Sequence, residues 1–212
     1  MERANKRIAV LVSGGGTNLQ AILDAMDAGK ITGGEIVRVI ASKPGVYALE
    51  RAEKHHIPTA VIQRRDFADG ADFDQAMLRQ LREDRIDLVV LAGYLSILGE
   101  QLTREYANRI LNIHPALIPS FCGPGAYGLH VHEKALAYGV KVTGATVHFV
   151  NEVVDGGAII LQKAVKVEDD DTPESLQKRV MEQAEWELLP RAVDLFCNDR
   201  LVITGRQVRI LE

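Results

Sequence analysis

Short apolar runs and amphipathic segments alternate along most of the chain. Residues 8–12 (IAVLV) are continuously apolar, as expected for a strand that is buried on both faces. In residues 17–26 the apolar side chains recur at helical spacing, and Gly29 is well placed to end that helix. Strands and helices that follow one another in this way are typical of βαβ units around a parallel sheet.

The same alternation continues through the middle of the chain. It predicts strands over residues 36–41, 58–62, 86–92 and 110–113, and helices over residues 46–55, 73–81 and 132–138. Two later apolar runs, residues 143–150 and 158–165, flank the turn-like NEVVDGG and favour an antiparallel pair. A helix is expected from Pro173 to Leu189 with a bend at Pro190, and a hairpin is expected over residues 201–210.

These elements predict an α/β fold with an open, mostly parallel twisted sheet, helices on both faces, and antiparallel strands late in the chain. The 212 residues suffice for one well-buried core and are few for two ordinary domains, so we expect a single domain over residues 1–212. With 47% hydrophobic and 25% charged residues, the composition is globular and excludes disorder as a global description.

Charge and cysteine content narrow the class of function. The formal net charge of −4 disfavours nucleic-acid binding, which needs a surplus of basic residues. Cys122 and Cys197 have no metal-ligand spacing and are too few for a disulfide scaffold, which indicates a reducing compartment. The longest apolar stretch, residues 88–98, is too short to span a membrane, and the charged N-terminus is unlike a signal peptide. We therefore expect a cytoplasmic protein with no membrane partner.

A glycine-rich segment, SGGGTN at residues 13–18, connects the first predicted strand to the first helix. Glycines let the backbone turn sharply and approach a ligand, and the N–H groups of a helix N-terminus suit an anion. The segment lacks the Gly-Lys-Ser/Thr of a P-loop, and Leu19 stands where the dinucleotide fingerprint has its third glycine. Phosphate binding and a plain tight turn, with Thr17 or Asn18 capping the helix, are equally supported.

Asn112 and His114 lie at the end of the fifth predicted strand, in LNIHP. Side chains alternate along a strand, so both point to one side, at the carboxyl end where open α/β sheets bind ligands. An amide can donate to a developing oxyanion while an imidazole carries a proton, which suits acyl chemistry. The pair could equally satisfy loop backbone at a strand end, and from these residues alone that simpler interpretation is favoured.

His148 and Asp155 lie in and beside the predicted antiparallel pair. Asp-Gly between apolar strands is foremost a hairpin signal, and the functional alternative makes Asp155 the carboxylate partner of a histidine. His148, in mid-strand, is expected to be structural. Together with His114, His130 and His132 these residues could form a metal site, but their spacing fits no metal-binding pattern and we expect no metal.

The fourth predicted strand leads into an apolar stretch, LAGYLSIL at residues 91–98. A stretch of this kind is usually core. The alternative is an apolar slot for a flat heterocycle whose polar edge is bound by backbone groups.

Taken together, SGGGTNLQAIL, VVLAGYLSIL, LNIHPALIPSF and VTGATVHFVNEVVDGGAIILQ resemble, in order and spacing, the folate-dependent phosphoribosylglycinamide (GAR) formyltransferases of purine biosynthesis. The resemblance extends from about residue 8 to residue 195. It implies a Rossmann-like formyltransferase fold and transfer of a formyl group from the co-substrate 10-formyltetrahydrofolate to the amine of GAR. We expect a monomer or weak homodimer whose partners are these two small molecules.

The resemblance also implies roles for individual residues. Asn112, His114 and Asp155 match the catalytic trio. The residues that would bind the phosphate and ribose of GAR are Gly16, Thr17, Asn18 and Glu185. Those that would enclose the pterin are Tyr94, Leu95, Ser96, Ile97, Leu98, Val150, Asn151, Glu152, Val153 and Val154. His130 matches the family's histidine before the next helix, and Arg64 is a candidate for the folate tail.

The chain departs from the family pattern at several positions. The loop SFCGPGAYG is longer than in the shorter members, and Ser96 stands where Arg is frequent. Ala158 replaces a common Pro, and Trp186 replaces a His. None of these positions belongs to the trio.

The mechanism expected from this chemistry is direct attack of the GAR amine on the formyl carbon. Asn112 and a protonated His114 would stabilise the oxyanion, and Asp155 would raise the pKa of His114. The main alternative is another enzyme that uses 10-formyltetrahydrofolate, either a hydrolase or one with a different formyl acceptor. A methionyl-tRNA formyltransferase would be expected to add a C-terminal domain, and a hydrolase an N-terminal one. A zinc hydrolase and a nucleotide-binding module without chemistry are weaker alternatives.

Overall fold

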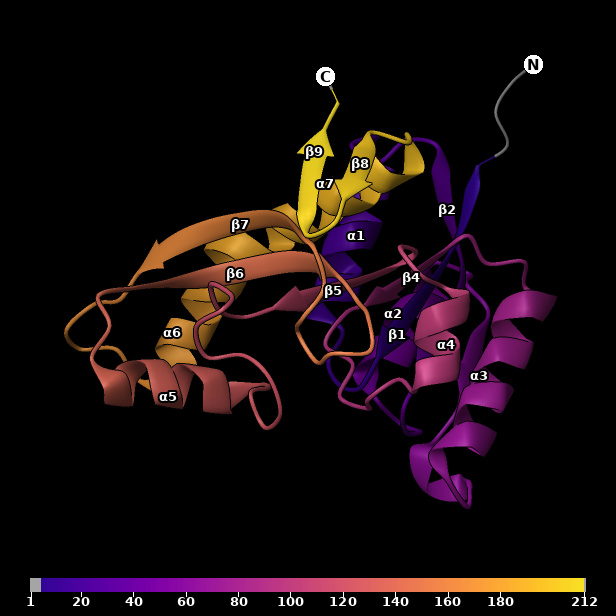
Figure 1. The fold of residues 1–212 in the computed structure, drawn as a ribbon, viewed down its shortest axis with the longest axis horizontal. Coiled ribbons are helices and arrows are strands. Elements are labelled where there is room, and N and C mark those ends of the chain that lie inside the picture. Colours follow the sequence, from indigo (N-terminus) through magenta and orange to yellow (C-terminus); the bar gives the residue numbers. More distant parts are fainter. Residues whose placement is uncertain (1–4, 212) are drawn as a thin grey trace.

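The computed structural model describes residues 5–211, which form a large and a small sheet with surrounding helices (Figure 1). The strands of the large sheet are β1 (Lys6–Val12), β2 (Gly34–Ala41), β3 (Thr59–Val61), β4 (Leu88–Leu91), β5 (Ile110–His114), β6 (Val142–Phe149) and β7 (Ile159–Lys166). The helices up to β6 are α1 (Thr17–Asp27), α2 (Tyr47–Lys54), α3 (Gly70–Glu83), α4 (Glu100–Glu105) and α5 (Leu129–Tyr138).

The large sheet has the strand order β3-β2-β1-β4-β5-β6-β7. The neighbours from β3 to β5 pair in parallel, whereas β6 is antiparallel to both β5 and β7. The chain builds outward from β1 to β3 and then returns to the other side of β1 with β4. Ligands of open α/β sheets bind at such a reversal of strand order. The predicted fold class, including the late antiparallel pair, is confirmed.

Helices cover both faces of the sheet, and the alternation of side chains along β1 explains why. Ile8, Val10 and Val12 belong to the core cluster formed with α1, α2 and the C-terminal helix. Ala9 and Leu11 point the other way, into the cluster with α3 and α4. A strand with apolar neighbours on both faces must be apolar at every position, which is the pattern seen in its sequence.

The long C-terminal helix differs from its prediction. It consists of α6 (Pro173–Val180), a π-helical turn (Met181–Glu185) and α7 (Trp186–Cys197). The predicted end at Leu189 is wrong, because α7 continues through Pro190 to Cys197. The irregular turn of this helix precedes Pro190. Such a turn adds a residue to the helical repeat and so changes which side chains face the neighbouring structure.

A short helix, α4, was not predicted from the sequence. Its start is held by Asp74 of α3, whose carboxylate accepts hydrogen bonds from the backbone N–H of Gly99 (2.9 Å) and of Leu102 (3.4 Å). Because this cap comes from a distant part of the chain, no local pattern marks the helix.

The end of the chain forms the predicted hairpin, with β8 (Leu201–Thr204) antiparallel to β9 (Gln207–Ile210). The start of β1 and the end of β9 lie at the same side of the molecule in Figure 1. Within residues 5–211, no helix combines the length and the apolar composition needed to cross a bilayer.

Candidate active site

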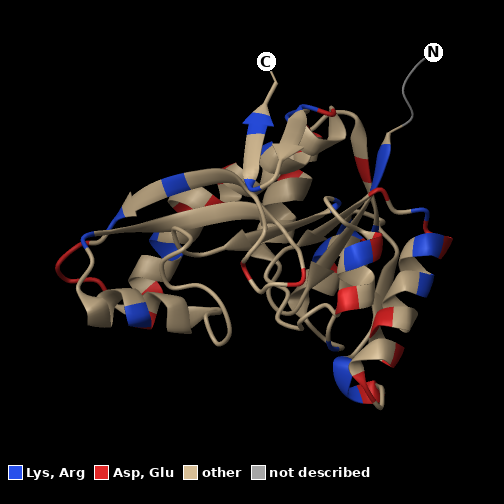
Figure 2. Ribbon diagram, viewed as in Figure 1, with Lys and Arg blue, Asp and Glu red and all other residues tan. Residues whose placement is uncertain are grey.

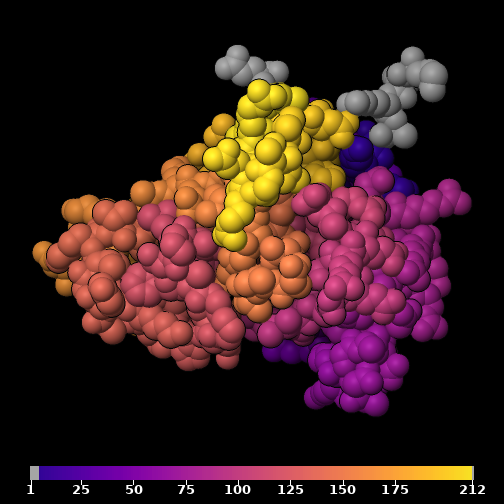
Figure 3. All heavy atoms as spheres, in the orientation of Figure 1, coloured from indigo at the N-terminus to yellow at the C-terminus, as the bar shows by residue number. Residues whose placement is uncertain are grey.

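A cleft of about 430 Å³ lies at the carboxyl ends of the central parallel strands. Its walls come from residues 14–18 after β1, residues 91–98 after β4, the end of β5, and the connection after β6. The β6–β7 connection, orange in Figure 3, lies on the surface between the segments that follow β5 and β4. The volume is that of a small-molecule site, typically about 300–1,000 Å³.

The hydroxyl of Ser13 connects the wall that follows β1 to the wall that follows β4. Its oxygen accepts hydrogen bonds from the backbone N–H of Leu95 (2.9 Å) and from the Ser42 hydroxyl (2.7 Å). The glycine loop after β1 is therefore fixed against the apolar loop after β4, so that the two predicted binding segments face one cleft.

Gly16 occupies the N-cap position of α1 in a left-handed conformation, with φ 72°, and no side chain caps the helix. A Cβ on Gly16 would lie 2.6 Å from the Cβ of Ala48, so glycine is required there for space as well as for backbone conformation. The expectation that Thr17 or Asn18 caps the helix is wrong. The helix N-terminus is thus open toward the cleft, which Thr17 and Asn18 line.

Asn18 instead binds Glu185 of the π-helical turn. The Asn18 Nδ2 donates to Glu185 Oε2 at 2.6 Å, and Asn18 Oδ1 is buried with no partner in residues 5–211. Glu185 is 6% exposed, and burial raises its pKa to about 7 in spite of the Asn18 hydrogen bond. Near neutral pH the Glu185 carboxyl group is therefore present in both its neutral and its charged form. Asn18 and Glu185 both line the cleft.

Asn112 and His148 lie opposite each other on β5 and β6. The His148 Nδ1 lies 2.8 Å from the carbonyl oxygen of Phe149, to which it donates, and this places the proton of a neutral ring on Nδ1. Its Nε2 then accepts from the Asn112 Nδ2 at 3.1 Å. His148 therefore fixes the orientation of the Asn112 amide and leaves the second Nδ2 hydrogen available to a ligand.

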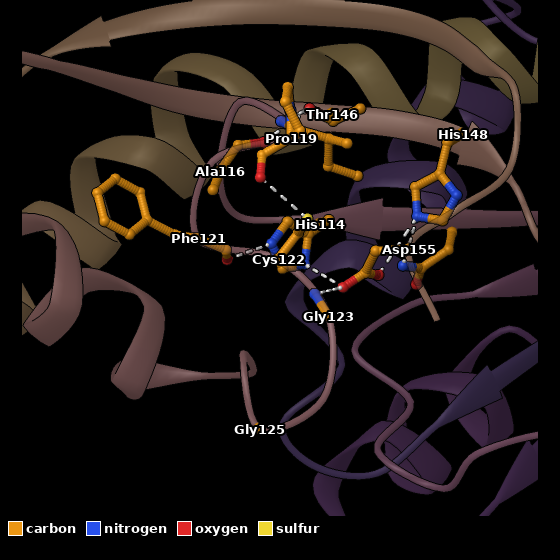
Figure 4. A network of polar contacts seen from close by, with 12 residues as sticks. His114, Ala116, Pro119, Phe121, Cys122, Gly123, Gly125, Thr146, His148 and Asp155 are labelled. Atoms are coloured by element: carbon orange, nitrogen blue, oxygen red, sulfur yellow. Dashed lines mark hydrogen bonds and ion pairs between the residues drawn. The ribbon is translucent and has the colours of Figure 1, made fainter. Parts of the chain in front are cut away.

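Asp155 lies between the two histidines of the site, and Figure 4 shows the three side chains directed toward one another. Its Oδ2 accepts from the backbone N–H of Gly123 at 2.8 Å and lies 3.6 Å from the His114 Nδ1. Its Oδ1 lies 3.6 Å from the His148 Nε2. The β6–β7 connection can carry Asp155 inward because Gly157 has no Cβ, which would lie 1.7 Å from the Phe149 carbonyl oxygen.

The expected cationic state of His114 is wrong for this structure. Burial lowers the pKa of His114 below its ordinary 6.5, and this effect exceeds the opposing attraction of Asp155. The ring is 3% exposed, and its Nε2 donates to the carbonyl oxygen of Phe121 at 2.9 Å. The Nδ1 of the neutral ring therefore carries a lone pair, and Asp155 would stabilise the imidazolium that forms when this atom takes up a proton.

Asp155 is charged near neutral pH. Burial alone would raise its pKa, but the nearby His148 ring, the proximity of His114 and the hydrogen bond from the Gly123 N–H together lower it. From its mid-strand position His148 was expected to be structural, yet its ring lines the cleft and contacts both Asn112 and Asp155. His148 and Thr146 are two residues apart on β6, so their side chains lie on the same face of the strand. This spacing is the sequence signal that β6 directs polar side chains toward the site, where Thr146 supports the loop after β5.

His132 is a further buried histidine near the site. It is fully buried, neither ring nitrogen has a partner in the described part of the chain, and burial, with a smaller effect of His114, lowers its pKa to about 4. His132 is therefore neutral and does not line the cleft.

The segment after β4 provides the apolar side of the cleft. All the residues predicted to enclose a pterin line it except Val153: Tyr94, Leu95, Ser96, Ile97, Leu98, Val150, Asn151, Glu152 and Val154. Leu95 and Ile97 are 58% and 71% exposed, so they form an open apolar rim and not core.

Two of the predicted residues lie elsewhere. His130 is the second residue of α5, so it lies within the helix and not before it; its Nδ1 pairs with Glu133 Oε2 at 2.8 Å, outside the cleft. Arg64 begins a 3₁₀ turn and donates to the Phe67 carbonyl oxygen, also away from the cleft. Within residues 5–211 no three His, Cys, Asp or Glu side chains are grouped to hold a metal ion.

Comparison with known proteins gives consistent matches. The family model described as Formyl transferase matches residues 6–193. Phosphoribosylglycinamide formyltransferase of Haemophilus influenzae is 43% identical over 92% of this chain and 89% of its own length. The trifunctional purine biosynthetic protein adenosine-3 of Drosophila melanogaster is 42% identical over 96% of this chain, which spans 15% of that longer protein. The crystal structure of glycinamide ribonucleotide transformylase 1 from Symbiobacterium toebii has a TM-score of 0.92, 44% identity, and coverage of 98% of this chain and 95% of that chain.

The cleft lies where the strand order reverses, and Asn112, His114 and Asp155 line it. Together with the family match, this site defines a formyltransferase. Within that class, the chain belongs to the phosphoribosylglycinamide formyltransferase family. The resemblance identified in the sequence and the predicted enzyme class are confirmed.

Proposed function

We propose that the protein transfers the formyl group of 10-formyltetrahydrofolate to the amine of GAR, giving formyl-GAR in purine biosynthesis. The observation that carries this proposal is the meeting of Asn112, His114 and Asp155 in a cleft whose lining segments differ in character. One segment is an open helix N-terminus, and another is an apolar rim.

These two lining segments of the cleft suit the two substrates. The phosphate and ribose of GAR would lie at Gly16, Thr17, Asn18 and Glu185, where N–H groups and polar side chains are available. The flat pterin would lie against Tyr94 and its neighbours after β4 and against the β6–β7 connection. The reacting amine and formyl carbon would then meet beside Asn112 and His114.

The chemistry we propose is direct attack of the amine on the formyl carbon. A new C–N bond forms, negative charge develops on the formyl oxygen, and the free Nδ2 hydrogen of Asn112 stabilises that oxygen. The bond between carbon and folate N10 then breaks as one proton moves from the attacking nitrogen to N10. Neutral His114 can carry this proton, because Asp155 stabilises its imidazolium form.

Cys122 and Ser13, two candidate nucleophiles near the cleft, are poorly suited to carry an acyl group. The Cys122 Sγ donates to the carbonyl oxygen of Pro119 at 3.2 Å, and burial, with a smaller effect of Asp155, raises the pKa of the thiol above its ordinary value. The Ser13 hydroxyl oxygen already accepts hydrogen bonds from the Leu95 N–H and the Ser42 hydroxyl. Neither side chain is activated as a nucleophile.

The test is to follow folate absorbance with purified protein and 10-formyltetrahydrofolate, with and without GAR. The proposal requires turnover that depends on GAR and yields formyl-GAR. Folate consumption at the same rate without GAR would identify a hydrolase instead. The reaction should also be insensitive to chelators, whereas a zinc hydrolase would lose activity.

An Asn112→Ala variant tests the mechanism within the same assay. Loss of one oxyanion donor typically costs about 3 kcal/mol, so kcat should fall roughly a hundredfold or more while the thermal unfolding curve stays close to that of the unmodified chain. Undiminished turnover would remove Asn112 from the mechanism.

We further propose that residues 1–212 act as a single domain, a monomer or weak homodimer, in the cytoplasm and without a nucleic-acid or membrane partner. The large sheet and both core clusters support one domain, and the net charge of −4 disfavours a polyanion. Light scattering across a range of concentrations tests the oligomeric state.

A further inference from the structure

We propose that Arg51 is a substrate-binding residue that supplies the positive charge for the phosphate of GAR from behind the glycine loop. This inference rests on the proposed function, since it takes a phosphate monoester as the ligand. It concerns a residue that lies outside the cleft and in none of the segments that resemble the family.

The cleft itself provides no fixed cation. Among the described residues that line it, none is Lys or Arg, whereas Glu152, Asp155 and Glu185 are acidic. The loop after β5 adds no charge either, since residues 115–128 contain no ionisable Lys, Arg, Asp or Glu, and this loop is tan throughout in Figure 2. A phosphate dianion entering such a cleft would meet net negative charge unless a cation acts from nearby.

Arg51 reaches the glycine loop from α2. Its Nε donates to the carbonyl oxygen of Gly15 at 2.8 Å, and its Nη1 donates to Gln20 Oε1 at 2.8 Å. The guanidinium carbon lies 4.8 Å from the centre of the Tyr47 ring, which holds the side chain in place. The charged group is thus fixed against the loop by several contacts at once.

The charge of Arg51 is not neutralised by an acidic partner in residues 5–211, and its hydrogen bonds to Gly15 and Gln20 both go to uncharged oxygens. Its Nη2 makes no hydrogen bond to any described residue. Several other arginines of the described chain differ in this respect, such as Arg38, whose Nε lies 2.7 Å from Asp84 Oδ2. A half-buried arginine held rigidly without a carboxylate is available to an anion.

The other side of the loop is prepared for the same anion. α1, whose N-cap is Gly16, has no side-chain cap among the described residues and no acidic residue in its first turn. Asn18, which lines the cleft, is 7% exposed, and its Oδ1 has no partner in the described structure. Because an amide oxygen accepts and a phosphate dianion does not donate, this unpartnered oxygen indicates that a hydroxyl of the same ligand, such as one of the ribose, completes the site beside the helix N-terminus.

Thr17 connects the two observations. It lines both the cleft and a neighbouring hollow that Gln20 and Arg51 also line, so only the glycine loop and Thr17 separate the guanidinium from the cleft. The aliphatic part of Arg51 is close as well, with its Cδ 3.4 Å from the position of a Cβ on Gly16. Across so short a distance, the positive charge of Arg51 lowers the electrostatic energy of a phosphate bound at the glycine loop.

The test compares Arg51→Gln, Arg51→Lys and Lys54→Gln in steady-state kinetics. Lys54 is a matched control, because it is on the same helix and also lies over the Tyr47 ring, with its Nζ 5.4 Å from the ring centre. Arg51→Gln should raise the KM for GAR roughly 10- to 100-fold, leaving kcat and the KM for 10-formyltetrahydrofolate within about twofold. Arg51→Lys keeps the charge and should recover a large part of this loss, and Lys54→Gln should change neither KM.

An unchanged KM for GAR in Arg51→Gln would overturn the inference, as would equal losses for both substrates or a failure of Arg51→Lys to recover binding. A second measurement does not depend on turnover. Inorganic phosphate and ribose 5-phosphate should raise the unfolding temperature of the unmodified chain and of Lys54→Gln, but not that of Arg51→Gln. If this protection is seen and GAR is not formylated, the proposed function fails while the role of Arg51 stands.

Discussion

The side-chain amide of Asn112 lies 3.1 Å from Nε2 of His148, across the antiparallel pairing of β5 and β6. His148 is 1% exposed and is held at Nδ1 by the Phe149 carbonyl oxygen. The amide that would face the formyl oxygen therefore has its orientation set by a buried ring on the next strand. The two residues act as a unit although neither is close to the other in sequence.

Replacing His148 tests this relationship. His148→Phe removes the acceptor that orients Asn112, so kcat should fall about tenfold to a hundredfold with both KM values little changed. His148→Gln, whose Oε1 can accept the same hydrogen bond, should recover part of the activity. His130→Phe, an exposed position outside the cleft, serves as the control and should behave as the unmodified chain. A kcat unaffected by His148→Phe would show that Asn112 is oriented by other contacts.

The protonation of His114 is a second prediction. Because burial outweighs the attraction of Asp155, His114 should titrate below the ordinary 6.5 in the ligand-free protein. Asp155→Asn removes the negative charge that favours the imidazolium, so it should lower this pKa further. NMR titration of the histidine ring signals, with His114→Asn to assign the resonance, measures both values. A midpoint above 6.5 would restore the cationic resting state expected from the sequence.

The raised pKa of Glu185 predicts how the free energy of unfolding depends on pH. Its pKa of about 7 in the folded protein exceeds the ordinary 4.5, so the folded state favours the protonated carboxyl. The resulting stabilisation is fully present below about pH 4.5 and is lost as the pH rises through about 7. At pH 8, Glu185→Gln should be more stable than the unmodified chain by up to roughly 3 kcal/mol, with little difference near pH 5.

Chemical denaturation at the two pH values measures this effect. Glu187→Gln, an exposed neighbour on the same helix, is the control and should show no such difference between the two pH values. An equal stability of Glu185→Gln and the unmodified chain at pH 8 would mean that Glu185 is charged without cost in the folded state. The same substitution should raise the KM for GAR, because the proposed ribose contact is weakened.

The glycine loop gives a prediction with an internal control. Gly16→Ala places a side chain at φ 72° and within 2.6 Å of Ala48, so it should lower the free energy of unfolding by about 1–3 kcal/mol and raise the KM for GAR. Gly15→Ala, where no atom lies within 4 Å of the added carbon, should have a small effect on stability. Thermal unfolding distinguishes the two, and equal effects would show that space at Gly16 is not the constraint.

Much of the fold could be predicted from local patterns. The apolar run of β1 and the helical spacing of α1 and α3 reflect burial against neighbours on fixed faces, which any sequence for this fold must satisfy. The helix α4 could not be predicted, because its cap is supplied by Asp74 from another helix. The π-helical turn was missed because its sequence, MEQAE, is an ordinary helical one.

The sequence by itself determined the alternation of strands and helices, the family, and the residue types from which a formyl-transfer site could be built. Only the tertiary structure decided how these residues act together. The balance between burial and the Asp155 charge at His114, and the inclusion of His148 beside Asn112, depend on distances between strands and loops far apart in the chain. Electrostatic and desolvation energies depend on such distances and on exclusion of water, and neither is encoded in the spacing of residues along a sequence.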